Sequence, residues 1–165
     1  MNVIELLGLT RLRRHHAIEH ATIAVLFRKR GQVVGVVGRS DFTGFHIFGP
    51  FTPEEIEPAV QEAISRLRNG ERDLAITPFC GTNIALTGIL AGGTALIAAG
   101  RSRREGWPRA LTAAMIATVA AARIGQTVQR YITTDANVGN TRLAGIHGYD
   151  TRPFGRHLKV YLRDG

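Results

Sequence analysis

The feature that most constrains the fold of this 165-residue chain is a run of 20 residues without a charge, Gly81 to Gly100 (GTNIALTGILAGGTALIAAG). A helix of about 20 apolar residues is long enough to cross the hydrocarbon core of a bilayer. We therefore expect this run to span a membrane. The alternative is that it forms part of a buried helical hairpin in a soluble protein.

A second, weaker apolar segment covers residues 110–132 (ALTAAMIATVAAARIGQTVQRYI). It is rich in alanine, and Arg123 interrupts it near its end. Because a chain that crosses a membrane once needs a partner helix to return, we expect residues 81–132 to form a transmembrane helical hairpin. Gly88 and Gly92 have the small-xxx-small spacing that suits close contact between membrane helices.

The expected location is the cell membrane, but two rules disagree on orientation. The loop between the apolar segments is rich in arginine, and the positive-inside rule places such a loop in the cytoplasm. That orientation would place the first eighty residues outside. The start of the chain, MNVIELLGL, lacks the basic region and long apolar run of a signal peptide. We expect a cytoplasmic N-terminal domain, and the loop arginines are evidence against it: Arg101, Arg103, Arg104 and Arg109.

The rest of the chain predicts an α+β fold, in which residues 1–80 form a small helix–hairpin–helix–strand domain attached to the transmembrane hairpin. In order, we expect a helix at 10–30, strands at 32–38 and 44–50 joined by a turn at 39–43, a helix at 52–70, and a strand at 73–78. The tail, residues 133–165, contains one alternating run, 157–163, that suits a final strand. The second helix is the clearest, because Thr52, Pro53 and Glu55 match an N-cap, a first-turn proline and a capping box.

The formal net charge of +8 raises the question of a nucleic-acid partner. The basic residues are scattered, however, and the sequence has neither an aromatic-interleaved RNA motif nor a helix-turn-helix pattern. Anionic lipid attracts the same charge. We therefore expect the lipid bilayer, other membrane proteins or a second copy of the chain as partners, and no nucleic acid. The single cysteine, Cys80, excludes an internal disulfide and fits a reducing compartment.

The motif that carries chemistry is H-x-x-E-H at His16, Glu19 and His20. On a helix, residues four apart lie on one face, so both histidines could reach one metal ion. This is the inverted form of H-E-x-x-H, in which two histidines bind zinc and the carboxylate is a general base. We predict His16 and His20 as ligands of zinc, or of another divalent transition metal, and Glu19 as the catalytic base. His15 points about 100° away from His16 on a helix.

A third ligand is needed, and Cys80 in PFCGTN is the best candidate, because a thiolate binds zinc strongly. His46 is the second choice, although its place between alternating aromatic residues favours cross-strand packing. His147, His157 and Asp135 lie in the tail and cannot be placed from sequence.

Other interpretations of these residues remain open. Cys80 could be a nucleophile with His16 or His20 as its base. The two histidines could also lie beside the basic residues at a membrane surface, with Glu19 paired to Arg13 or Arg14.

The pieces HAIEHATI, GFHIFGP, NGERDLAITPFCGTN and RYITT, in this order, resemble an uncharacterised family of small bacterial membrane proteins, over about residues 12–135. The anchors H-x-x-E-H-x-T-I and P-x-C-G-T are also similar to those of a larger membrane family of predicted metal-dependent enzymes. The resemblance favours a metal site. The motif positions that carry over to this chain are His16, Glu19, His20, Thr22 and Cys80, with Pro78, Gly81 and Thr82 around the cysteine. In both patterns a histidine commonly stands three residues before the cysteine, where this chain has Thr77, and another aromatic residue commonly stands at position 46. The first departure removes a possible ligand, and the second argues against His46 as a ligand.

Two functions follow as hypotheses. The first is a membrane-anchored metal-binding protein that acts as a zinc-dependent, peptidase-like hydrolase, unless a fourth protein ligand closes the site and makes the metal structural. The second is a non-catalytic accessory or assembly subunit of a membrane protein complex.

Overall fold

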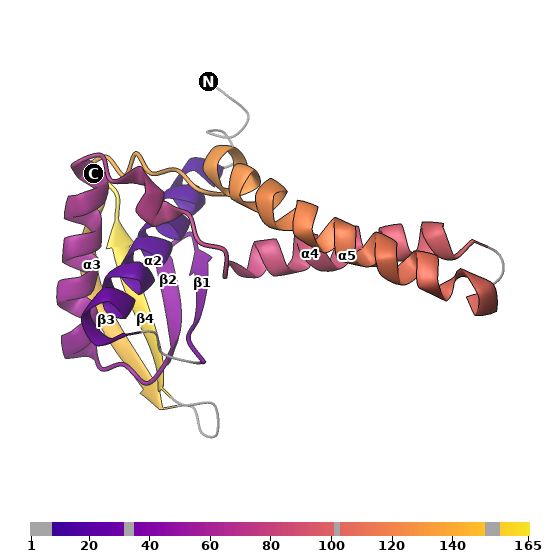
Figure 1. The fold of residues 1–165 in the computed structure, drawn as a ribbon. Coiled ribbons are helices and arrows are strands. Elements are labelled where there is room, and N and C mark those ends of the chain that lie inside the picture. The colour runs from indigo at the N-terminus through magenta and orange to yellow at the C-terminus, as the bar shows by residue number, and fades with distance from the viewer. Residues whose placement is uncertain (1–7, 32–34, 101–102, 151–155) are drawn as a thin grey trace. The chain divides into compact units, whose positions relative to one another are not determined.

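The computed structural model describes residues 8–31, 35–100, 103–150 and 156–165. The described chain is α+β, as predicted, with four α-helices and one four-stranded antiparallel sheet (Figure 1). The elements are, in order, α2 (Leu9–Arg30), β1 (Val37–Asp41), β2 (Gly44–Gly49), α3 (Pro53–Arg68), η1 (Arg72–Ala75), α4 (Gly81–Ala99), α5 (Arg103–Val128), η2 (Gln129–Thr133), β3 (Arg142–Asp150) and β4 (Arg156–Arg163).

The chain divides into two compact units. The first, here called the sheet unit, comprises Met1–Ile76 and Arg130–Gly165. The second, here called the hairpin unit, comprises Thr77–Gln129 and contains α4 and α5.

The sheet unit is a two-layer structure, with strand order β1-β2-β4-β3 and helices α2 and α3 on one face (Figure 1). Side chains alternate along the strands, so Phe45 and Ile47 of β2 and Val160 of β4 point into the core. Two helices supply the other half of the core: Ile18 and Val25 from α2, and Ile56 and Val60 from α3.

Helix α3 begins as its sequence predicts. Thr52 is the N-cap, Pro53 is the first helical residue, and the Glu55 side chain accepts a hydrogen bond from the Thr52 backbone N–H at 2.9 Å. Both halves of the capping box are present, which satisfies N–H groups that the first helical turn would otherwise leave unpaired.

Two predicted strands need correction, and one observed strand was not predicted. The predicted strand at 73–78 is wrong, because residues Arg72–Ala75 form a 3₁₀ helix that buries Leu74 and Ala75. The first strand runs over Val37–Asp41 and so takes in part of the predicted turn, because Gly35 has a φ of 83° that interrupts an extended chain. Residues 32–34 of that prediction lie outside the described part. Strand β3 has no counterpart in the prediction, since its glycines and a register shift between Leu143 and Gly145 obscure its alternation.

In the hairpin unit, α4 and α5 pack against each other. Both helices are long and apolar enough to cross a membrane, by length and composition alone. The helices approach closely at Gly125, where an added Cβ would collide with the Asn83 side chain. Gly88 and Gly92 do not lie close to α5, because a Cβ at either position would meet nothing within 4 Å among the described residues.

The two ends of the hairpin unit are joined by one side chain. Gln129 donates a hydrogen bond to the Thr77 carbonyl at 2.8 Å and accepts one from the Thr77 N–H at 2.9 Å. The Asn83 amide also donates to the Thr77 carbonyl, at 3.2 Å. Because Gln129 is completely buried, these bonds satisfy polar groups that would otherwise be costly to remove from water.

Candidate metal-binding site

The two motif histidines lie together on α2, one helical turn apart. Their ring centroids are 4.3 Å apart and the rings meet edge to face, at 62°. His20 is buried, whereas His16 is half-buried. The i,i+4 spacing therefore places the two rings side by side on one helix face, as predicted from the sequence.

The hydrogen bonds of these rings fix which nitrogen carries the proton. The Nδ1 of His16 is 3.0 Å from the Thr133 carbonyl oxygen, and the Nδ1 of His20 is 2.8 Å from the Ala75 carbonyl oxygen. A carbonyl oxygen can only accept, so each Nδ1 must be the N–H donor. In the neutral rings the lone pair is then on Nε2, which is the arrangement that metal-binding histidines usually show.

Glu19 lies between these histidines in the sequence, and its side chain is anchored on the sheet. Its carboxylate accepts a hydrogen bond from the Ser40 hydroxyl on β1. Gly38 of the same strand makes room for it, because a Cβ at that position would collide with the Glu19 side chain. Only 4% of Glu19 is exposed, so its carboxylate is held in one place inside the sheet unit.

Cys80 stands at the N-cap of α4, in the hairpin unit. It is buried, and it is the single cysteine of the sequence. A thiol, like the imidazoles of His16 and His20, is a group that could hold a metal ion. The role of each of these residues stays a prediction.

His15 has different partners from His16, as the helical geometry predicts. Its Nδ1 is 2.8 Å from the Asp41 carbonyl oxygen, so it donates to β1. Its Nε2 lies 3.7 Å from an Asp164 carboxylate oxygen. Burial lowers the pKa of His15 more than these acceptors raise it.

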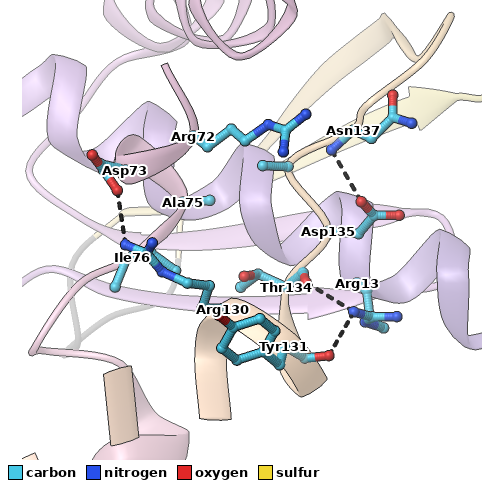
Figure 2. A pocket seen from close by; sticks show the side chains of 11 residues that line it. Arg13, Arg72, Asp73, Ala75, Ile76, Arg130, Tyr131, Thr134, Asp135 and Asn137 are labelled. Carbon is cyan, nitrogen blue, oxygen red and sulfur yellow. Dashed lines mark hydrogen bonds and ion pairs between the residues drawn. The ribbon is translucent and has the colours of Figure 1, made fainter. Parts of the chain in front are cut away.

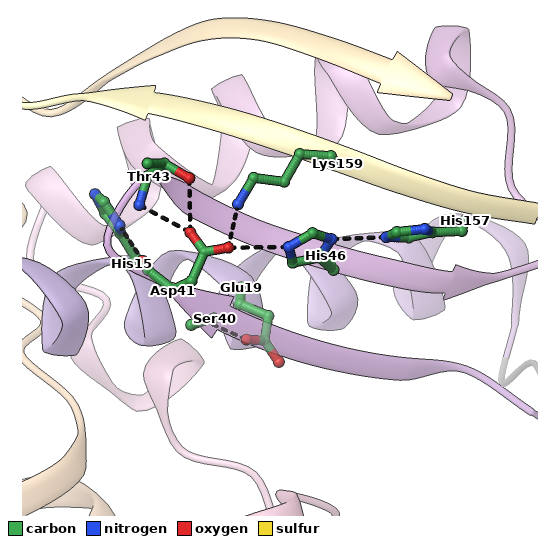
Figure 3. A network of polar contacts seen from close by, with 8 residues as sticks. All are labelled: His15, Glu19, Ser40, Asp41, Thr43, His46, His157 and Lys159. Carbon is green, nitrogen blue, oxygen red and sulfur yellow. Dashed lines mark hydrogen bonds and ion pairs between the residues drawn. The ribbon is translucent and has the colours of Figure 1, made fainter. Parts of the chain in front are cut away.

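A second polar cluster, which the sequence did not reveal, lies on the sheet face opposite α2 and α3 (Figure 3). One Asp41 carboxylate oxygen accepts hydrogen bonds from Lys159 at 2.6 Å and from His46 at 2.9 Å. The other accepts from the backbone and the hydroxyl of Thr43, both at 2.8 Å. His46 continues the cluster to His157, with ring nitrogens 2.6 Å apart. We call these five residues the Asp41 cluster.

The Asp41 cluster shifts two pKa values. Burial raises the pKa of the Asp41 carboxyl, but the hydrogen bonds from Lys159, Thr43 and His46 together outweigh it and hold this pKa well below its usual range. Burial lowers the pKa of His46, and the hydrogen bond to Asp41 only partly opposes this effect. Because Nε2 of the neutral His46 ring must donate to the carboxylate, Nδ1 accepts from His157.

Strand pairing explains why sequence reasoning missed this cluster. His46 stands opposite Lys159 in the β2–β4 pair, and it stands opposite Arg39 in the β1–β2 pair. The expected cross-strand packing of His46 is confirmed, since its ring centroid lies 4.9 Å from that of His157 on β4. The alternation around His46 could have suggested an exposed-face position, but not the two cluster members on β4, His157 and Lys159, which lie more than 100 residues away.

Comparison with known proteins identifies relatives of unknown function. A family model described as "Domain of unknown function (DUF6391)" matches residues 11–146. An uncharacterized protein of Picosynechococcus sp. (strain ATCC 27264 / PCC 7002 / PR-6) is 36% identical over 134 residues, which cover 74% of this chain and 65% of that protein. This chain thus spans about two thirds of the length of that relative. No solved structure matches.

Proposed function

We propose that this chain, which belongs to the DUF6391 family, is a membrane-anchored zinc-binding protein that acts as a peptidase-like hydrolase. The observation that carries the proposal is the histidine pair on α2. Both rings donate Nδ1–H to backbone carbonyls, so in the neutral form each ring carries its metal-binding lone pair on Nε2. Two such rings one turn apart are an arrangement that suits a shared metal ion.

Cys80 is the proposed third ligand. Two imidazoles and one thiolate form the mixed nitrogen and sulfur donor set that suits zinc, and three protein ligands leave one position for a reactant. A fourth protein ligand would close that position and make the metal structural.

Glu19 is the proposed general base. A bound zinc ion would act as a Lewis acid and make water more acidic. Glu19 would then accept the proton, and the Ser40 hydrogen bond would orient its carboxylate for this step. The substrate would be a peptide or a membrane-associated molecule.

The proposed membrane anchor is the hairpin unit. Its two helices are apolar over windows in which only 6% and 11% of the residues are buried. Large apolar side chains such as Ile97, which is 83% exposed, would then face lipid.

Metal content tests the proposal. The full chain is purified in a non-ionic detergent, and its metal is measured by elemental analysis beside His16→Ala, His20→Ala and Cys80→Ala. His147→Ala is the matched control, because His147 is an exposed residue of β3. We expect one zinc per chain in the wild type and the control, and loss of zinc in the other three variants. A wild-type protein without stoichiometric metal would overturn the proposal.

Glu19→Gln separates the two roles that a carboxylate could have. Zinc retained with loss of peptide hydrolysis identifies Glu19 as the base, whereas loss of zinc identifies it as a ligand. If the folded wild type binds no metal and cleaves no peptide, the second hypothesis takes its place: an accessory subunit whose exposed apolar helices contact other membrane proteins.

A further inference from the structure

The sheet unit contains a pocket of about 530 Å³ that the proposed metal site does not use (Figure 2). Three arginines from three parts of the chain line it: Arg13 of α2, Arg72 of η1 and Arg130 of η2. We call it the arginine pocket, and we propose that it binds a phosphate group held by these three guanidinium groups. This inference does not depend on a metal ion.

Arg13 is positioned for this role by the backbone. Its Nη2 donates to the Tyr131 carbonyl at 3.0 Å and to the Thr134 carbonyl at 3.2 Å, which fixes the guanidinium in one place. Its Nε is buried and has no hydrogen-bond acceptor among the residues that the structure describes. A buried donor without an acceptor is costly, and an oxygen atom of a bound ligand would satisfy it.

Arg72 and Arg130 supply charge that is available to a ligand. Arg72 is exposed and makes no ion pair with any described residue. Arg130 lies 3.0 Å from an Asp73 carboxylate oxygen, but the Asp73 side chain is 91% exposed. Exposed ion pairs contribute little free energy, so a phosphate could replace Asp73 as the partner of Arg130.

The carboxylates of the pocket do not cancel its positive charge. Asp135, the second acid in the lining, accepts a hydrogen bond from the Asn137 backbone at 3.0 Å. It also lies 3.6 Å from the Arg14 guanidinium, which offsets its negative charge. The remaining charge is positive and comes from guanidinium forks, whose geometry matches the oxygens of a phosphate.

The place of the pocket in the chain indicates two sources for the phosphate. Ile76 and Arg130, which both line it, are the residues at which the sheet unit leads into and out of the hairpin unit. If the hairpin spans a bilayer, this is the level at which phospholipid headgroups lie. The other source is a small phosphorylated molecule in solution, and the pocket is large enough for more than the phosphate itself.

Isothermal titration of the full chain in non-ionic detergent tests the proposal, at about 0.15 M salt so that weak surface attraction is screened. The probes are inorganic phosphate, dihexanoyl phosphatidic acid, and dihexanoylglycerol, which is the same lipid without the phosphate. We expect saturable binding of at least one phosphate probe and none of dihexanoylglycerol. Binding of phosphatidic acid alone identifies a lipid headgroup, whereas comparable binding of inorganic phosphate identifies a soluble ligand.

Two arginine variants locate the site. Arg72→Ala and Arg130→Ala should each weaken binding about tenfold, because each removes one charge-assisted contact. Arg142→Ala is the matched control, since Arg142 is exposed at the end of β3, outside the pocket lining. The proposal is overturned if neither phosphate probe binds, if dihexanoylglycerol binds as tightly, or if the control loses as much affinity as Arg72→Ala. Removal of metal by a chelator should leave the titration unchanged, so that this test and the zinc test can fail separately.

Discussion

Large apolar side chains occupy opposite places in the two units of the chain. In the sheet unit, Phe45 and Ile47 are at most 1% exposed. In the hairpin unit, Leu96 and Ile97 are 71% and 83% exposed. The sheet unit therefore has the core of a water-soluble domain, stabilised by removing apolar surface from water. The hairpin unit shows the reverse distribution, which suits helices surrounded by lipid or by a partner.

One buried polar side chain in each unit is paired in a similar way. In the sheet unit, Lys159 is 3% exposed and is paired with Asp41. In the hairpin unit, the buried amide of Gln129 is paired with the backbone of Thr77. The two units thus differ in whether their large apolar side chains are buried or exposed. Both units pair these two buried polar side chains, because an unpaired buried polar group is costly in either setting.

The largest expected effect comes from a matched pair of leucines. Leu158→Ala, at a position that is 1% exposed in β4, should lower the free energy of unfolding by about 2–5 kcal/mol, because it leaves a cavity in the core. Leu96→Ala, at a position that is 71% exposed in α4, should change it by less than about 0.5 kcal/mol in detergent. Denaturant titration followed by circular dichroism measures both. Similar losses for the two variants would show that α4 is covered.

The second prediction concerns the polar base of the hairpin unit. Gln129→Ala should cost about 1–3 kcal/mol, because it leaves the Thr77 N–H without its side-chain acceptor and the Thr77 carbonyl with the Asn83 amide alone. Gln61→Ala is the control, since the Gln61 amide is exposed and makes one long contact of 3.5 Å to Glu57. The same titrations apply, and equal effects for the two glutamines would contradict the assignment of Gln129 as the residue that joins the two ends.

A matched pair of glycines tests close approach in each unit. Gly38→Ala should lower the free energy of unfolding by about 1–3 kcal/mol, because the new methyl group would displace the Glu19 side chain. Gly92→Ala should be neutral or stabilising by up to about 1 kcal/mol, because alanine favours the helix and nothing lies within 4 Å of the new Cβ. If Gly92→Ala destabilises the detergent-solubilised protein, α4 has a contact partner at that position.

The smallest expected effect is the pH dependence of the sheet unit. The pKa of His46 lies below its usual value of 6.5 in the folded chain, so the unfolded chain binds the proton first as the pH falls. Stability should therefore decrease as the pH falls below about 6.5. The low pKa of Asp41 adds a loss in the same direction, but only in strong acid.

Melting curves at pH 7.5, 6.5 and 5.5 would measure this dependence, with an expected fall of at most a few degrees. His46→Gln removes one titrating ring and should make the curve shallower between pH 6.5 and 5.5. An unchanged slope in this variant would show that other groups, such as His15, whose pKa burial also lowers, carry the pH dependence.

Features of the chain that depend on local spacing could be predicted from the sequence. The helix that carries His16, Glu19 and His20 follows from its own pattern, and the i,i+4 rule places the two rings together. The capping box of α3 is likewise contained within four residues, Thr52 to Glu55. The two apolar helices follow from composition and length. Each of these depends on neighbours within one or two helical turns.

Only the tertiary structure decides which partners these side chains have. His16 bonds to a carbonyl 117 residues away and His20 to one 55 residues away. The arginine pocket joins three distant segments, and the Asp41 cluster requires β2 to pair with the distant strand β4 as well as with its neighbour β1. Helical and strand periodicity fix the face on which a residue lies, but not the segment that it faces. Long-range packing makes that choice, and in this protein it sets the histidine tautomers and gathers the guanidinium groups.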